Sequence, residues 1–218
     1  MATPAQLVTA ISETTGVPLP TVVDIDRKLV KGKLRTKGGR GFSAAQMTAL
    51  DAARLLTAVL GSPQANTSVE AVERYDNTRI DKARSSDKLF GAARLDDLAA
   101  LPARHSFVDA LAALIASAST GSLAKLMADS TDGWVPHIEV FAFSRATRGN
   151  IRIAGLPKGQ TANIEYIPSP ADARTVRAKP SSRGRDAHTN LITGDLEQSR
   201  RITERTILPI AKLLARET

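Results

Sequence analysis

The sequence contains no cysteine, and only 4% of its 218 residues are aromatic. Without cysteine the chain forms neither disulfides nor a thiolate zinc site. With so few aromatic side chains, the core has to be built from Ala, Leu, Val and Ile, which favours helices. The sequence has no run of about 18 apolar residues and no charged and apolar segments typical of a signal peptide at its start. These absences are compatible with a protein of the bacterial cytoplasm that does not bind membranes.

Motifs of common enzymes are also missing. The sequence has no GK[ST] phosphate loop, no HExxH motif and no GxSxG motif. Residues 39–44 have the spelling of a dinucleotide fingerprint, but they do not follow an apolar strand, so we expect no nucleotide there. His105, His137 and His188 are far apart and have no evident paired carboxylates. We therefore expect no catalytic residues, no cofactor and no metal site.

The sequence does contain an excess of positive charge in one place. The formal net charge is +8, and between Arg27 and Gly41 there are seven Lys or Arg and no Asp or Glu. Local charge of one sign, next to glycines that let the backbone approach a phosphate, predicts contact with nucleic acid. An anionic membrane surface is the weaker choice of partner. The structural alternative is a solvated basic helix in a small bundle.

This charged segment belongs to a helix-turn-helix pattern. Residues 4–14 are predicted to form a helix, and residues 15–17, which include a glycine, break it. The second helix is expected to begin at Pro18 and to end at Gly32 or Gly38. The side chains predicted to face inward are Leu7, Val8 and Ile11 in the first helix and Val22, Ile25 and Leu29 in the second.

A basic wing is expected after the second helix. Residues 34–36 are predicted to form a strand, residues 37–41 a glycine turn, and residues 42–44 a return strand. The segment 42–46 is rich in alanine and could instead be helical. In that alternative the basic turn is a flexible loop.

Residues 5–62 resemble the winged helix-turn-helix class of DNA-binding regulators, of bacterial and prophage type. In that class the second helix enters the major groove, and the wing lies along the phosphates or reaches into the minor groove. The resemblance implies that the side chains facing the groove are Thr21, Asp24, Arg27, Lys28 and Lys31. It implies that the side chains facing the DNA backbone are Lys33, Arg35, Lys37 and Arg40.

Helices are also predicted through the middle of the chain. Thr48 and Asp51 have the spacing of a capping box and open a helix that ends near Gly61. The short polar segment 63–68 is the first candidate domain boundary. Further helices are expected over residues 69–83, 89–101, 105–117 and 122–128.

The period of the apolar residues changes from 3.6 to 2 at residue 134. The strands predicted from it, in an antiparallel meander, are residues 135–143, 150–154 and 162–167. A second basic surface is formed by Arg145, Arg148, Arg152 and Lys158, although a solvated hairpin explains it nearly as well. A final helix, from residue 194 onward, contains Pro209, which should bend or divide it. After a flexible arm, such a helix is expected to dock on a partner or a second protomer.

The sequence therefore predicts a mainly α protein with a small antiparallel β meander, of the α+β class. The expected units are a winged helix-turn-helix domain, a helical and β-meander domain, a linker and a docking helix, at residues 1–62, 69–167, 168–193 and 194–218. The expected function is sequence-specific binding of double-stranded DNA by a transcriptional regulator, as a homodimer or higher oligomer. The location expected from this function is the bacterial cytoplasm, in association with the nucleoid. RNA polymerase or another protein is a further expected partner of the last helix. The alternatives are a small terminase-like DNA-packaging protein and an RNA-binding or polymerase-binding accessory factor.

Overall fold

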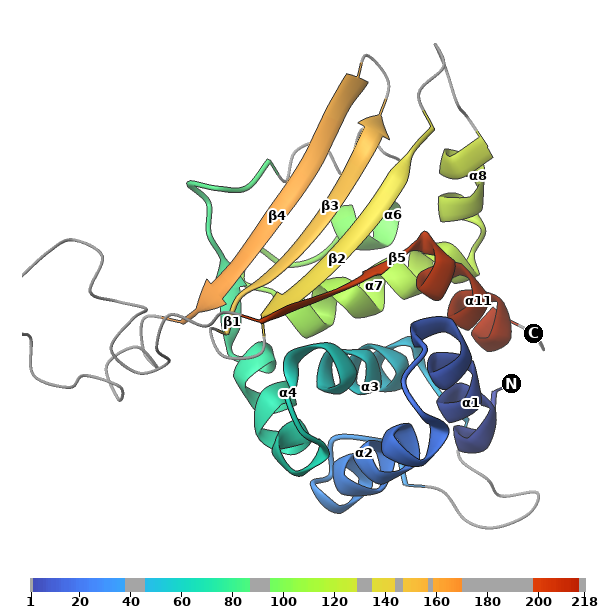
Figure 1. Ribbon diagram of the computed structural model, residues 1–218. Helices are drawn as coiled ribbons and strands as arrows, with labels where there is room; N and C mark the ends of the chain where they lie inside the picture. Colours follow the sequence, from blue (N-terminus) through green and yellow to red (C-terminus); the bar gives the residue numbers. More distant parts are fainter. Residues whose placement is uncertain are drawn as a thin grey trace, which may run out of the picture.

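Two helices joined by a short turn begin the chain in the computed structural model, which describes residues 2–37, 46–86, 95–128, 135–143, 147–156, 159–169 and 198–215 (Figure 1). Helix α1 (Pro4–Thr15) starts with a capping box between Thr3 and Gln6. It ends at Gly16, whose φ of 72° lies in the left-handed region that glycine adopts freely. Helix α2 (Leu19–Lys31) follows at once. The two predicted helices, the glycine turn between them and all six predicted inward side chains are confirmed.

Helix α3 (Ala49–Gly61) begins with the predicted capping box. The hydroxyl of Thr48 accepts a hydrogen bond from the Asp51 N–H, and the Asp51 carboxylate accepts one from the Thr48 N–H. Most of the helix is buried, because other helices pack around it. The polar segment 63–68 contains the 3-10 helix η2 (Ala65–Thr67) and leads directly into α4 (Ser68–Asp76).

An antiparallel sheet lies beside these N-terminal helices (Figure 1). Its strands lie in the order β1-β4-β3-β2-β5. They are β1 (Thr78–Ile80), β2 (His137–Phe143), β3 (Gly149–Leu156), β4 (Gln160–Pro168) and β5 (Ser199–Thr203). The predicted meander is confirmed in β2, β3 and β4.

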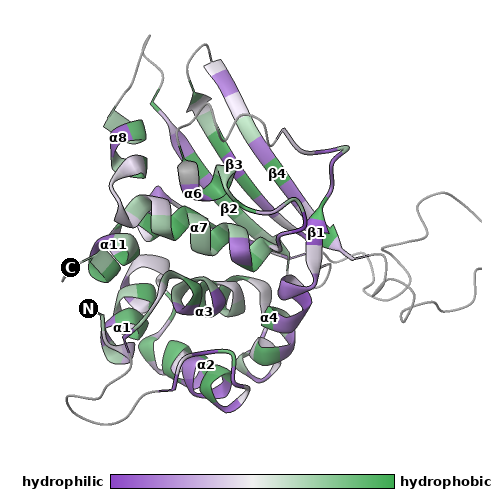
Figure 2. Ribbon diagram, turned by 180° about the vertical axis from the view of Figure 1, so that it is seen from behind, coloured by the Kyte–Doolittle hydropathy of each residue, from purple (hydrophilic) through white to green (hydrophobic). Residues whose placement is uncertain are grey.

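Helices cover one face of this sheet. They include α6 (Asp96–Ala99) and α7 (Phe107–Ser119). Helix α8 (Ser122–Ala128) follows α7, packs against it and lies beside the sheet in Figure 1. Figure 2 views the molecule from that side, with α6 and α7 in front of the strands. Contact is so close that a side chain at Gly149 of β3 would collide with the ring of Phe107 in α7. Among the described helices, none lies over the opposite face of β2, β3 and β4, which Figure 1 shows toward the viewer.

At both edges of the sheet the structure has a strand where the sequence predicts a helix. Residues 78–80 were expected to continue the helix over 69–83, and residues 199–203 to belong to the last helix. Instead β1 pairs with β4, and β5 pairs with β2, so long-range strand pairing overrides the local helical pattern. The helix expected over residues 89–101 is reduced to α6 within its described part, and residues 87–94 lie outside the described residues.

The last helix, α11 (Glu204–Ala215), docks on its own chain. It packs against α1 and α7, and the hydroxyl of Thr206 donates to the carbonyl of Thr14 at 3.3 Å. Its buried face therefore contacts its own chain, and docking of α11 on a partner or a second protomer stays a prediction. Pro209 lies inside the helix without dividing it.

One hydrophobic core joins these parts. Its buried residues come from α1, α2 and α3, from α7, from the inner face of the sheet and from α11. Helices on both sides of residues 63–68, where the sequence predicts a domain boundary, contribute to this single core. The fold thus fixes α2 relative to the sheet.

No single helix in the described ranges has the length and apolar character needed to cross a membrane. Helices α7 and α8, which are bent by 73° at their junction, meet those two criteria when they are taken together.

Candidate nucleic-acid interface

Helix α2 lies on the outside of the helical part, at the end of the molecule away from the sheet (Figure 1). It is 13 residues long, and Val22, Ile25 and Leu29 bury its inner face against the core. Hydrophobic and hydrophilic residues alternate along it in Figure 2, as expected for an amphipathic surface helix. Its other face is free to meet a ligand.

The outer face of α2 presents most of the predicted groove residues. Thr21, Arg27 and Lys31 are exposed. Asp24 and Lys28 are half-buried and form an ion pair one turn apart, with Lys28 Nζ 2.6 Å from Asp24 Oδ2. The five residues thus lie together, but the charge of Lys28 is partly balanced by its neighbour.

Two of the predicted backbone-contacting cations follow the helix on the surface. Lys33 and Lys37 are exposed, and Lys33 has a φ of 60°, in the left-handed region that few non-glycine residues adopt. Arg40 lies outside the described residues. The cations from α2 therefore continue onto the segment that enters the predicted wing.

Arg35 differs from this prediction because its side chain turns inward. Its guanidinium is 8% exposed and pairs with Asp26, with Nε 2.5 Å from Oδ1 and Nη2 2.7 Å from Oδ2. A guanidinium held at two points by a buried carboxylate is committed to that pair. Arg35 is therefore a structural residue at this surface, and its expected contact with the DNA backbone is not available in this conformation.

The first strand of the predicted wing does not form. Residues 34–36 are irregular, and the return strand expected over residues 42–44 lies outside the described residues. The carbonyl of Leu34 instead accepts a hydrogen bond from Arg54 Nη1 of α3 at 3.2 Å. The entry to the basic loop is thus held by a side chain and not by a β ladder.

The carboxylate of Asp51 contacts residues on both sides of the segment 38–45. Its Oδ1 accepts from the Thr36 N–H at 2.8 Å, and its Oδ2 accepts from the Thr48 N–H at 3.0 Å. Burial alone would raise the pKa of Asp51, but the backbone N–H groups of Thr36 and Thr48 and the two threonine hydroxyls together hold it below its ordinary value. Asp51, at the start of α3, therefore connects Thr36 to Thr48, and residues 38–45 lie outside the described residues.

The acidic residues of this surface are all engaged with neighbours. Asp24 pairs with Lys28, Asp26 with Arg35, and Asp51 with the loop ends. Arg27, Lys31, Lys33 and Lys37 form no ion pair with any residue that the structure describes. We name these four exposed cations the α2 basic surface.

The second basic surface expected from the sequence is partly visible on the sheet. Arg148 lies 3.4 Å from Glu165, and Arg152 lies 3.4 Å from Glu139. Arg145 and Lys158 lie outside the described residues. Sequence reasoning missed the two glutamates as partners of these arginines, although the alternation of the strands places all four side chains on one face.

The two histidines that the structure describes contact other groups of the protein. His105 is buried, and its Nδ1 lies 2.8 Å from the carbonyl oxygen of Pro102, so it is the donor there. Its Nε2 lies 2.8 Å from the hydroxyl of Tyr166. The Nδ1 atom of His137 lies 3.0 Å from Oε2 of Glu204, and His188 is outside the described residues. Within the described part of the chain, no group of three or more His, Asp or Glu side chains could hold a metal ion.

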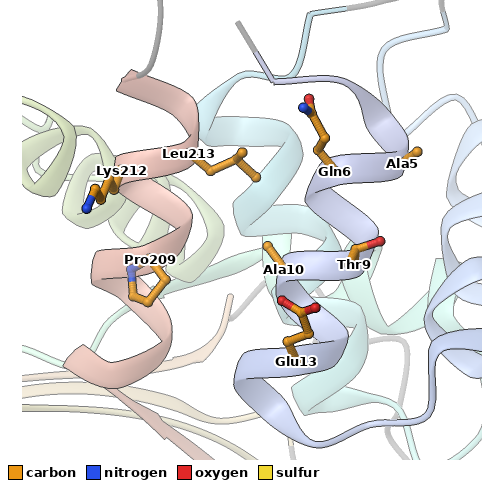
Figure 3. A pocket seen from close by; sticks show the side chains of 8 residues that line it. All are labelled: Ala5, Gln6, Thr9, Ala10, Glu13, Pro209, Lys212 and Leu213. Atoms are coloured by element: carbon orange, nitrogen blue, oxygen red, sulfur yellow. The ribbon is translucent and has the colours of Figure 1, made fainter.

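A surface groove also runs between α1 and α11 (Figure 3). Leu213 and Ala10 face each other across it, and Pro209 lines the same side as Leu213. Glu13 and Lys212 add one charge of each sign to its lining. The groove therefore offers no excess of positive charge and does not extend the α2 basic surface.

Comparisons of the chain with family models, curated proteins and solved structures found no match.

Proposed function

We propose that the chain binds double-stranded DNA in a sequence-specific manner, as a transcriptional regulator of bacterial or prophage type, through α2 and the basic loop that follows it. The observation that carries the proposal is the charge arrangement. The acids of this surface are engaged internally, and the four cations of the α2 basic surface point outward. Exposed positive charge without local neutralisation favours a polyanion.

The shape of α2 supports duplex DNA as that polyanion. A helix of 13 residues is about 20 Å long, and an α-helix fits the roughly 12 Å width of the major groove. Thr21, Arg27 and Lys31 offer hydroxyl and cationic groups along one exposed face. Lys33 and Lys37 then lie beyond the end of the helix, where the DNA backbone would run.

The energetics of this interface should be dominated by counterion release. Contacts from the four cations predict that the logarithm of affinity falls with the logarithm of salt concentration at a slope of about −4. The double variant Lys33→Ala/Lys37→Ala should reduce that slope to about −2, since each lost phosphate contact removes roughly one unit. Anisotropy of a fluorescein-labelled duplex, titrated with the full chain at several salt concentrations, measures both values.

Lys125→Ala is the matched charge control. Lys125 is exposed on α8, far from α2 in Figure 1, so its removal changes the net charge without touching the interface. The control should keep the slope of the wild type. If Lys125→Ala and Lys33→Ala lower the slope equally, binding follows total charge and the α2 basic surface is not the interface.

A further inference from the structure

The face of the sheet that no described helix covers is the one toward the viewer in Figure 1. The alternation of buried and less buried residues along the strands places several arginines and a phenylalanine on this face. The register places Phe141 of β2 between Asn150 of β3 and Arg201 of β5. The inner face is marked by buried residues that alternate with these, such as Val140 and Ala142. Phe141 and its neighbours therefore face away from the core.

Glu139 underlies two of the arginines. Arg201 Nη1 lies 2.7 Å from Glu139 Oε1, and Arg152 Nη1 lies 3.4 Å from Glu139 Oε2. The Glu139 side chain is 12% exposed, whereas Arg201 is 55% and Arg152 is 49% exposed. The carboxylate is thus covered by the cations that it orients, and the surface that meets solvent is positive.

Glu165 repeats this arrangement on β4. Arg84 and Arg148 lie 3.3 Å and 3.4 Å from its Oε1, and the carboxylate is again much less exposed than Arg84. The guanidinium of Arg148 also lies 4.4 Å from the centre of the Phe143 ring, a cation–π distance. Two half-buried carboxylates therefore hold arginines across this face of the sheet.

These arginines keep hydrogen-bonding capacity for a ligand. A guanidinium has five N–H donors, and the contacts of Arg152 and Arg201 with Glu139 each use Nη1 alone. Between them, the half-buried Phe141 offers an aromatic face. Oriented cations beside a partly exposed aromatic ring are the elements with which proteins bind phosphates and stack unpaired bases.

We propose that this open sheet face is a second nucleic-acid-binding surface, specific for a single strand, whose phosphates contact Arg152 and Arg201 and whose bases stack on Phe141. Charge complementarity identifies the occupant, because the outward layer is cationic. The aromatic ring favours a single strand over a duplex, whose bases are already stacked. The proposal does not depend on the α2 basic surface, which lies at the other end of the molecule.

The test uses the full chain and two probes, a fluorescein-labelled oligo(dT) and a duplex, each of about 20 nucleotides or base pairs. Phe141→Leu removes the aromatic face and keeps an apolar side chain. Loss of one stacked base should weaken oligo(dT) binding about five-fold or more and leave duplex binding unchanged. Phe141→Tyr, which keeps the ring, should bind oligo(dT) like the wild type.

Arg201→Gln is a second variant that spares the fold, since Glu139 keeps Arg152 as its partner. It should also weaken oligo(dT) about five-fold or more, whereas Lys125→Ala should not. The Lys33→Ala/Lys37→Ala variant should affect the duplex alone, so failure at one surface is distinguishable from failure at the other. Wild-type oligo(dT) affinity in Phe141→Leu and Arg201→Gln would overturn the proposal. The proposal would also be overturned if Phe141→Leu changed the oligomeric state, measured as the mass of the assembly in solution. The face would then be an interface between two copies of the chain.

Discussion

Arg35 and Asp26 form a buried, two-point ion pair at the base of the basic loop, with Nε 2.5 Å from Oδ1 and Nη2 2.7 Å from Oδ2. The two side chains are 8% and 12% exposed. Asp26 lies on the inner face of α2, and Arg35 lies four residues after the end of that helix. The pair therefore fixes the path by which the chain leaves α2, and it positions Lys33 and Lys37 at the surface.

Removal of the buried carboxylate should destabilise the protein strongly. Asp26→Asn leaves the Arg35 cation buried without a charged partner, which costs about 3 to 5 kcal/mol of unfolding free energy. Asp24→Asn is a matched control, because it removes the same charge from the same helix at an ion pair whose side chains are 34% and 51% exposed. Exposed pairs of this spacing contribute about 0.5 kcal/mol or less. Urea denaturation measures both, and equal losses would contradict a structural role for the Asp26–Arg35 pair.

Asp51 should make stability depend on acidic pH. Its pKa is lowered in the folded protein, so the unfolded chain takes up the proton first as pH falls. The contribution of Asp51 is therefore complete above the ordinary aspartate pKa of about 4 and is lost as pH falls toward the lower folded value. Asn cannot accept at both side-chain atoms, so Asp51→Asn should lose roughly 0.5 to 2 kcal/mol at neutral pH.

The difference between wild type and Asp51→Asn should then shrink between about pH 5 and pH 3. Thermal melts across this range measure it. A difference that stays constant with pH would show that the hydrogen bonds to Thr36 and Thr48 do not depend on the charge of Asp51.

Tyr75 ties α4 to the sheet through its hydroxyl. The Phe143 N–H donates to that oxygen at 2.8 Å, and the carbonyls of Phe143 and Arg148 lie 2.9 Å from it as acceptors. Burial raises the pKa of Tyr75, so the hydroxyl stays protonated and can donate at any ordinary pH. Tyr75→Phe leaves these backbone groups without that partner and should cost about 1 to 3 kcal/mol. Chemical denaturation that finds no loss would show that water replaces the hydroxyl.

Local features of the fold were predictable from the sequence. The 3.6-residue spacing of Leu7, Val8 and Ile11 placed α1, and the spacing of Thr48 and Asp51 placed the start of α3. Alternation of period 2 placed β2, β3 and β4. Each of these patterns is complete within about ten residues, so a single segment contains the information.

Features that depend on distant partners were not predictable in this way. Strand β5 exists because residues 199–203 pair with β2, more than 50 residues earlier in the chain. The inward orientation of the Arg35 side chain depends on Asp26, and the sequence contains a signal for this contact. Asp26 follows Ile25 on the stripe that faces the core, and a carboxylate at such a position needs a cationic partner.

Selection from random duplex DNA at about 150 mM salt tests the central claim most directly, with the full chain and its Lys31→Ala and Lys37→Ala variants. The wild type should enrich one sequence motif. Lys31→Ala should alter that motif, because Lys31 lies on the groove-facing side of α2, whereas Lys37→Ala should keep the motif and weaken binding to all sequences. Absence of an enriched motif, with binding that vanishes as salt rises, would contradict sequence-specific recognition by α2.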